Sequence, residues 1–168
     1  MVSEIDMFTD EPLTCTDKSG RTYSVAGGNA VHCSFIMDMY RVFSPKPASQ
    51  GLPPEDLETC EKWVKDILNI GINVLARRGE EIIGHAALIP DNKGKTGEFI
   101  IFVHQDSRNL GVGTELTRWT FERARGLGFQ TIWLTVAMTN FIAIRLYRKM
   151  GFEYCDMDDC ERTMIARI

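Results

Sequence analysis

Apolar and polar positions in the first third of the chain predict one strand followed by two helices. Residues 21–28, RTYSVAGG, alternate in polarity as a half-buried strand does. In residues 29–43, apolar side chains recur at helical spacing at Val31, Phe35, Met39 and Val42. In residues 55–68 they recur in the same way at Leu57, Cys60, Val64, Ile67 and Leu68. Each of these faces is expected to pack against a core.

A proline-rich connection separates the two predicted helices. Residues 44–56, SPKPASQGLPPED, contain four of the six prolines of the chain. Proline lacks a backbone N–H group and interrupts helices and sheets, so this segment is predicted to be a loop.

The middle of the chain predicts three antiparallel strands in a meander. Residues 72–90 and 97–104 are apolar, strand-like runs. Short polar segments that contain glycine interrupt them at residues 77–81 and 90–97, and such segments commonly join neighbouring antiparallel strands.

The last third adds two helices and three strands. Residues 113–128 present one apolar helical face, formed by Leu116, Trp119, Ala124 and Leu127. A buried strand is expected at residues 131–138, and Asn140 can cap a helix that ends at Gly151. Residues 152–156 and 162–168 supply closing strands. This order predicts one α/β or α+β domain over residues 1–168, a mixed sheet with helices on both faces.

Composition and charge exclude several classes of function. The chain has 168 residues, 44% hydrophobic and 25% charged, which suits one globular domain. Its net charge is −4 and its basic residues are scattered, so no nucleic-acid partner is expected. It has no apolar run of about 18 residues, and its first twelve residues are too acidic for a signal peptide. A cytoplasmic protein without a membrane partner is therefore expected.

The cysteines and histidines do not predict a disulfide framework or a metal site. The five cysteines form no Cys-x-x-Cys pair, and their odd number argues against complete pairing. The three histidines, His32, His85 and His104, are not at metal-ligand spacing from those cysteines. We expect reduced, structural cysteines and no metal.

A glycine-containing loop at residues 104–116, HQDSRNLGVGTEL, is the first candidate for chemistry. It follows a predicted strand and opens a predicted helix, and it contains Arg108, Gly111 and Gly113. A helix N-terminus with close backbone approach favours an anion such as phosphate. The loop lacks the lysine of a P-loop and the third glycine of a dinucleotide fingerprint. A tight structural turn is the alternative interpretation.

A second motif follows in residues 139–152. Its residues are Asn140, Ala143, Tyr147, Gly151 and Phe152. Together with Arg108-x-x-Gly111-x-Gly113, it resembles the signature of the GNAT family of acetyl-CoA-dependent N-acetyltransferases. The resemblance implies a mixed, mostly antiparallel sheet of about seven strands with about four flanking helices. It also implies acetyl-CoA as the cosubstrate, without a metal.

The resemblance implies a cofactor site around the glycine loop. Backbone N–H groups from Asn109 to Thr114 would hold the diphosphate of coenzyme A, and Arg108 would close the loop or pair with a phosphate. The strand end at residues 102–104 would hydrogen-bond the pantetheine amides. Relatives often have Arg-Gly-x-Gly-x-Gly, whereas Asn109 replaces a glycine here. The implied cofactor-binding residues are Phe102, Val103, His104, Arg108, Asn109, Leu110, Gly111, Val112, Gly113, Thr114, Asn140 and Ala143.

Acetyl transfer to an amine needs a proton acceptor and a proton donor. In the family that this chain resembles, a glutamate at the position of Glu98 often acts as the base, directly or through water. Tyr147 lies on the same helical face as Asn140 and would protonate the departing thiolate. The alternatives are a solvent-exposed charge for Glu98 and a half-buried core aromatic for Tyr147. His85 and His104 lie on apolar strands and are expected to be structural.

The acceptor is less well defined by the sequence. The segment MYRVFSPKP, residues 39–47, and the strand GEFIIFVHQD, residues 97–106, resemble bacterial protein-lysine acetyltransferase domains. The predicted reaction is direct transfer to a primary amine, on a small molecule or a protein lysine, and a homodimer is possible. A catalytically silent, regulatory acyl-CoA-binding domain and a purely structural domain are the alternatives.

Overall fold

The computed structural model describes residues 11–46, 48, 51–92, 94–155 and 163–168. Within them lie eight strands: β1 (Leu13–Thr16), β2 (Thr22–Gly28), β3 (Ile72–Arg78), β4 (Glu81–Pro90), β5 (Thr96–Val103), β6 (Thr131–Thr135), β7 (Glu153–Tyr154) and β8 (Thr163–Arg167). Residues 1–10, on which the expected absence of a signal peptide depends, lie outside the described part.

All eight strands belong to one sheet, in the order β1-β2-β3-β4-β5-β6-β8-β7. Every neighbouring pair is antiparallel except β5 and β6, which run parallel. The mixed, mostly antiparallel sheet is confirmed, including the meander of β3, β4 and β5. The additional strand is β1, a short edge strand whose residues are mostly exposed and therefore lack the alternation that a sequence pattern detects.

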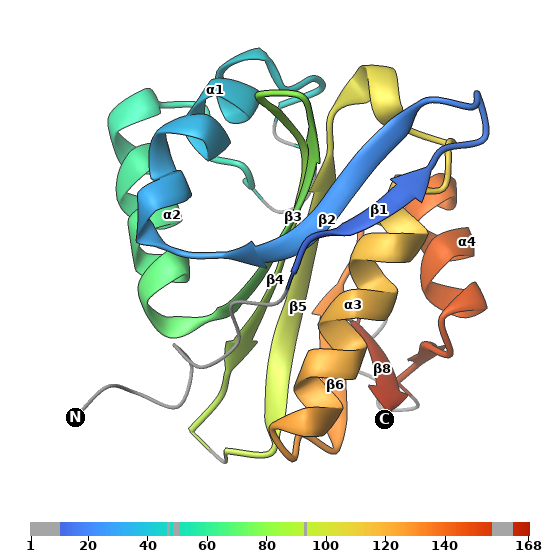
Figure 1. Ribbon diagram of the computed structural model, residues 1–168. Coiled ribbons are helices and arrows are strands. Elements are labelled where there is room, and N and C mark those ends of the chain that lie inside the picture. Colours follow the sequence, from blue (N-terminus) through green and yellow to red (C-terminus); the bar gives the residue numbers. More distant parts are fainter. Residues whose placement is uncertain (1–10, 47, 49–50, 93, 156–162) are drawn as a thin grey trace.

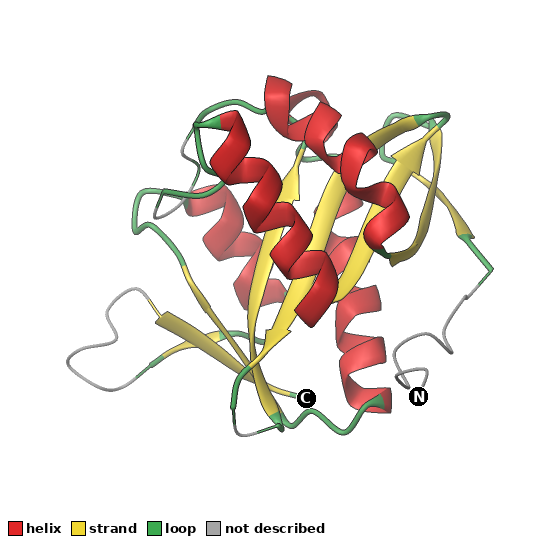
Figure 2. Ribbon diagram, turned by 90° about the vertical axis from the view of Figure 1, so that its left-hand side faces the viewer, coloured by secondary structure: helices red, strands yellow, loops and turns green. Residues whose placement is uncertain are grey.

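The described part of the chain has four α-helices flanking this sheet, as predicted: α1 (Cys33–Val42), α2 (Leu57–Ile70), α3 (Val112–Gly126) and α4 (Phe141–Lys149). Short 3-10 helices precede α1 at Ala30–His32 and precede α3 at Gln105–Ser107. Figure 1 shows α1 and α2 on one side of the sheet and α3 and α4 on the other. Figure 2 shows two of the helices lying across the front of the strands.

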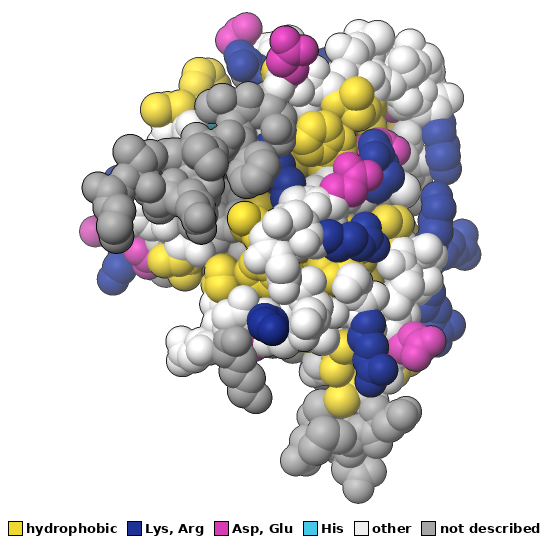
Figure 3. All heavy atoms as spheres, turned by 60° about the horizontal axis from the view of Figure 1, so that its bottom comes forward, with side chains coloured by type: hydrophobic (Ala, Val, Ile, Leu, Met, Phe, Trp, Pro, Cys, Tyr) yellow, Lys and Arg dark blue, Asp and Glu magenta, His cyan; other side chains and the backbone are white. Residues whose placement is uncertain are grey.

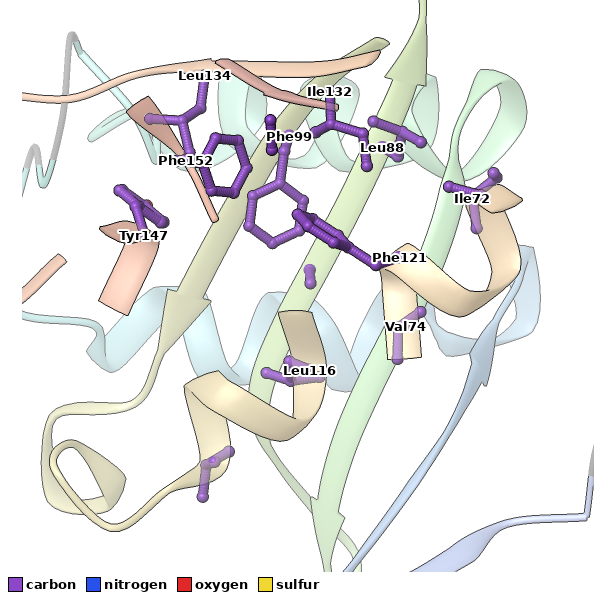
Figure 4. Close-up of a cluster of buried hydrophobic side chains, with 14 of the residues drawn as sticks. Ile72, Val74, Leu88, Phe99, Leu116, Phe121, Ile132, Leu134, Tyr147 and Phe152 are labelled. Carbon is purple, nitrogen blue, oxygen red and sulfur yellow. The ribbon is translucent and has the colours of Figure 1, made fainter. Parts of the chain in front are cut away.

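Each face of the sheet has its own core. On β5, Phe99 packs in the cluster that includes α3 and α4, whereas Phe102 packs in the cluster beneath α1 and α2. This follows from the strand period of two, which sends alternate side chains to opposite faces. In Figure 4, Phe99 lies close to Phe121 of α3 and to Phe152, and the ring centroids of Phe121 and Phe152 are 5.5 Å apart.

The buried face predicted for α1 is wrong in three of its four positions. Val31, Phe35 and Val42 are 75%, 41% and 58% exposed, and only Met39 is buried. The face that packs on the sheet is formed by Ile36, Met37, Met39 and Tyr40. Apolar residues occupy both stripes of this helix, so periodicity alone does not select the buried one. On α2, Leu57 is likewise exposed, whereas Cys60, Val64 and Ile67 are buried as expected.

Cys15, Cys33, Cys60 and Cys155 are free thiols, and Cys160 lies outside the described residues. Among the described residues, no group of three or more His, Cys, Asp or Glu side chains is arranged to hold a metal ion. No helix in the described part of the chain is both long and apolar enough to cross a membrane.

Candidate active site

The site begins where β5 and β6 separate. These parallel strands are aligned only from Thr96 to Glu98 on β5 and from Thr131 to Trp133 on β6. Beyond Glu98, β5 continues to Val103 along β4 alone. One edge of β5 therefore lies open next to the end of β6.

Backbone groups of alternate β5 residues face this opening. Asp91 N–H donates to Thr96 O and His104 N–H donates to Ile83 O, so the even-numbered residues of β5 bond to β4. The antiparallel alternation then turns the N–H and C=O groups of Phe99, Ile101 and Val103 towards β6. An extended amide-containing ligand can pair with such an edge as an added strand does.

A cleft with a volume of about 800 Å³ occupies the opening. Its walls come from β5, the end of β6, most of the loop and helix start at residues 108–114, α4 and the connection between α1 and α2. Its charged lining residues are Lys18, Arg108, Arg145 and Lys149, which are basic, and Glu98, which is acidic. Figure 3 shows Lys and Arg side chains gathered along the side of the molecule that carries α4 in Figure 1. The cleft therefore suits an anionic ligand although the whole chain is acidic.

Two residues in the left-handed conformation shape the loop before α3. Asn109 has a φ of 61° and Gly111 has a φ of 96°. Asparagine is among the few residues other than glycine that tolerate this conformation. Asn109 therefore adopts a backbone conformation that glycine would also allow. A Cβ atom on Gly111 would meet no atom within 4 Å, so the loop is open at that point.

The N-terminus of α3 has no side-chain cap. Gly111 is the N-cap residue and has no side chain to accept a hydrogen bond from the first turn. The first intrahelical bond near the N-cap runs from Glu115 N–H to Gly111 O at 3.2 Å. The backbone N–H groups of Val112, Gly113 and Thr114 thus lack intrahelical acceptors and present the positive end of the helix dipole. This arrangement can bind a phosphate.

Arg108 connects the loop to β5. Its Nε donates to Val103 O at 2.9 Å, and its guanidinium lies 4.9 Å from the centre of the Phe43 ring. Partial burial lowers the pKa of Arg108, which remains a cation. Of the two roles proposed for Arg108 from the sequence, these contacts support closure of the loop.

Three residues of the predicted cofactor site do not line the cleft: His104, Leu110 and Val112. The prediction that the backbone of His104 binds the ligand is wrong, because its N–H belongs to the sheet. Its Nδ1 accepts from Asp106 N–H at 3.2 Å and caps a 3-10 helix. The Val112 side chain is fully buried in the core, and Leu110 O accepts from Lys18 N–H. The remaining predicted residues line the cleft.

The signature on α4 positions two side chains. Asn140 caps the helix as predicted, with its Oδ1 accepting from Ala143 N–H at 3.2 Å. Two turns later, Tyr147 lines the cleft, and its side chain is largely buried against the ring of Phe152, with centroids 5.6 Å apart (Figure 4). Burial raises the pKa of the Tyr147 hydroxyl, so it stays protonated at neutral pH.

Glu98 lies where β5 and β6 separate. It lines the cleft and is half-buried, and no hydrogen bond or ion pair joins its carboxylate to another described residue. Burial raises the pKa of this carboxyl, because it disfavours the charged form. The solvent-exposed alternative therefore does not describe Glu98.

Other lining residues were not identified from the sequence. The connection between α1 and α2 contributes an apolar wall of Phe43, Pro45, Ala48 and Leu52. Lys18, from the turn between β1 and β2, also reaches the cleft. Of the basic residues, Arg145 and Lys149 had a detectable signal, since they belong to a short basic group on the predicted helix. The other contributions depend on tertiary contacts.

Comparison with known sequences identifies the family. Residues 35–152 match the sequence model of the Acetyltransferase (GNAT) family, and the chain belongs to this family. An L-methionine sulfoximine/L-methionine sulfone acetyltransferase of Pseudomonas aeruginosa is 28% identical over 107 residues, 60% of this chain and 62% of that protein. Streptothricin acetyltransferase of Streptomyces lavendulae is 41% identical over 51 residues, 30% of this chain and 27% of that protein. The chain thus matches less than two thirds of either relative's length.

Solved structures show the same fold. The GNAT domain of S. lividans PAT superposes with a TM-score of 0.81 at 16% identity, covering 94% of this chain and 97% of that domain. A putative acetyltransferase from Salmonella typhimurium, solved with its cofactor acetyl-CoA, gives 0.69 at 16% identity, covering 86% and 93%. That residues 1–168 form a single acetyltransferase domain stays a prediction.

Proposed function

We propose that this protein is an N-acetyltransferase that transfers the acetyl group of acetyl-CoA to a primary amine. The observation that carries the proposal is the cleft between β5 and β6, which joins an uncapped helix N-terminus to a half-buried carboxylate. The family membership and the acetyltransferase names of the relatives support the same reaction class.

The two parts of coenzyme A match two parts of the cleft. Its pantetheine amides would pair with the backbone of Phe99 and Ile101, which faces the opening, and with the N–H of Val103, whose C=O already accepts from Arg108 Nε. Its diphosphate would lie at the N-terminus of α3, where the amides of Val112–Thr114 are free of intrahelical bonds. This binding needs no metal ion, because backbone N–H groups supply the partial positive charge.

Glu98 and Tyr147 would handle the protons. The amine nitrogen attacks the thioester carbonyl directly, and Glu98 accepts the proton that the amine loses, either directly or through water. Tyr147 donates its hydroxyl proton to the sulfur as the carbon–sulfur bond breaks. The products are the acetylated amine and coenzyme A, with one proton taken up by Glu98 and one given by Tyr147.

The acceptor would enter beside the connection between α1 and α2. This connection gives the cleft an apolar wall of Phe43, Pro45, Ala48 and Leu52. Among the described residues that line the cleft, Glu98 is the acidic one. A neutral or cationic amine with an apolar neighbouring group fits these walls. The names of the two sequence relatives give small-molecule acceptors, and a protein lysine stays the other candidate.

Binding and turnover separate this proposal from its alternatives. Calorimetry with acetyl-CoA should show binding, which a purely structural domain would not. Release of coenzyme A thiol should then be measured with amino acids, polyamines, aromatic amines and lysine peptides. Amine-dependent release is expected, whereas tight binding without release from any acceptor would favour the silent acyl-CoA-binding alternative. A homodimer and a cytoplasmic location stay predictions.

A further inference from the structure

The turn between β1 and β2 docks onto the loop that precedes α3. Lys18 N–H in this turn donates to Leu110 O at 3.0 Å, and Leu110 directly precedes the N-cap residue Gly111. Lys18 is also one of the residues that line the cleft, and it is exposed. A hairpin from the start of the chain therefore forms part of the wall beside the helix N-terminus.

A buried carboxylate fixes the conformation of this turn. The Asp17 side chain has no solvent exposure, and it accepts from Ser19 N–H at 2.8 Å, Ser19 Oγ at 2.6 Å and Arg21 N–H at 3.1 Å. Hydrogen bonds, above all from Ser19, lower the pKa of the Asp17 carboxyl. These bonds close the turn around residues 17–21.

An arginine ties the same turn to the loop from a second direction. Arg78 Nη2 lies 2.5 Å from Asp17 Oδ2, and Arg78 Nη1 donates to Ser107 Oγ at 3.4 Å. Ser107 is buried and directly precedes Arg108. The turn is thus held against residues 107–110 both by the backbone of Lys18 and by the Asp17–Arg78 ion pair.

We propose that Lys18 binds a phosphate group of coenzyme A, and that Asp17 is a positioning residue that holds Lys18 there. The inference rests on the proposed function of the cleft. No ion pair or hydrogen bond joins the Lys18 ammonium to another described residue, so the charge is available to a ligand. Next to it, the N-terminus of α3 favours negative charge, and a lysine ammonium commonly binds phosphate as a point charge.

The test compares acetyl-CoA affinity across matched lysine variants by calorimetry. Lys18→Met should weaken binding by about 3- to 10-fold, the range of a solvent-accessible charge contact, and Lys18→Arg should restore most of the affinity. Lys62→Met removes the same charge from the exposed surface of α2 and should leave the affinity unchanged. The loss in Lys18→Met should shrink at high salt.

A parallel titration with 3′-dephospho-acetyl-CoA identifies the phosphate. An equal loss with both ligands assigns Lys18 to the diphosphate, and a loss seen only with acetyl-CoA assigns it to the 3′-phosphate. Unchanged affinity in folded Lys18→Met, or an equal loss in Lys62→Met, would overturn the inference alone. Wild-type protein that does not bind acetyl-CoA would overturn the proposed function as well.

The positioning role of Asp17 has its own measurement. Asp17→Asn should weaken acetyl-CoA binding when Lys18 is present and should have no further effect in the Lys18→Met background. Additive losses in the double variant would show that Asp17 does not act through Lys18.

Discussion

Glu98 and Trp133 form the last aligned pair of the parallel ladder between β5 and β6. Beyond this pair the strands separate, and the cleft opens. Glu98 is therefore placed at the closed end of the opening by the backbone of both strands, rather than by a mobile loop. The strand backbone thus fixes the start of the Glu98 side chain at this point of the cleft.

Replacing Glu98 tests its proposed role as the base. Glu98→Gln keeps the shape of the side chain but cannot accept a proton, so turnover at pH 7 should fall by about 10²- to 10⁴-fold. The loss should shrink at high pH, where more of the amine is already neutral. Wild-type turnover should rise with pH through a pKa above the usual range of glutamate, because burial favours the protonated form.

Glu58→Gln is the matched control, since Glu58 lies on the exposed surface of α2. It should retain wild-type turnover at every pH. Near-normal activity and an unchanged pH profile in Glu98→Gln would contradict the role of Glu98 as the base. Bulk water, rather than Glu98, would then accept the proton that the amine loses.

Replacing Tyr147 tests the proton donor. Tyr147→Phe keeps the ring that packs on Phe152 but removes the hydroxyl, so turnover should fall while the affinity for acetyl-CoA stays within about twofold. Tyr154→Phe, in β7, removes a hydroxyl away from the cleft lining and should change neither quantity. If Tyr147→Phe turned over at the wild-type rate, Tyr147 would not be the proton donor and would serve only in core packing.

Asn109 offers a test of the loop backbone. Its φ of 61° disfavours most side chains, so Asn109→Ala should lower the free energy of unfolding by roughly 1 kcal/mol. Asn109→Gly should stay close to the wild type, because glycine adopts this conformation without strain. Chemical denaturation of both variants measures the difference, and equal stabilities would show that the left-handed conformation is not maintained in solution.

The burial of His85 predicts that the free energy of unfolding depends on pH. It is 1% exposed, its Nδ1 lies 2.7 Å from Tyr40 Oη, and its Nε2 lies 2.8 Å from Asn73 Oδ1. Asn73 Nδ2 donates to Ile67 O and Gly71 O, so Asn73 Oδ1 faces the histidine as an acceptor. Nε2 then carries the proton and Nδ1 accepts from Tyr40, which describes a neutral ring.

Burial lowers the pKa of His85 to about 4, whereas an unfolded histidine titrates near about 6.5. Below about pH 6.5 the unfolded state binds a proton that the folded state does not. The free energy of unfolding therefore falls by about 1.4 kcal/mol per pH unit as the pH drops from about 6.5 towards 4. Above that range, His85 adds no pH dependence. His85→Gln should lose this slope, as measured by chemical denaturation at several pH values. Parallel profiles for the two proteins would contradict a neutral, buried His85.

Much of this site could be predicted from local sequence. The spacing of Arg108, Gly111 and Gly113 predicted the loop before α3, and Asn140 was correctly predicted to cap α4. These features depend on residues close together in the chain, where conformational preference acts directly. The apolar run of residues 97–104 similarly predicted a strand, though not which of its backbone groups remain open.

The rest depends on tertiary contacts that leave little local signal. Both stripes of α1 are apolar, and the buried one is the stripe that brings Tyr40 to His85. The separation of β5 from β6 depends on where two distant segments stop pairing. Lys18 reaches the cleft only because a turn at one end of the chain docks on Leu110. None of these relationships has a fixed spacing in the sequence.

The most direct test of the acetyl-CoA site is calorimetry on a variant that fills the space before α3. A side chain on Gly111 would enter open space, so Gly111→Trp should fold, at the strain cost of a positive φ, while blocking the approach of a phosphate. Gly128→Trp is the matched control, because Gly128 also has a positive φ and open space around it but lies at the other end of α3. We predict that the wild type and Gly128→Trp bind acetyl-CoA alike and that Gly111→Trp loses at least about tenfold, a difference of about 1.4 kcal/mol. Equal affinity in a folded Gly111→Trp protein would contradict the placement of the cofactor in this cleft.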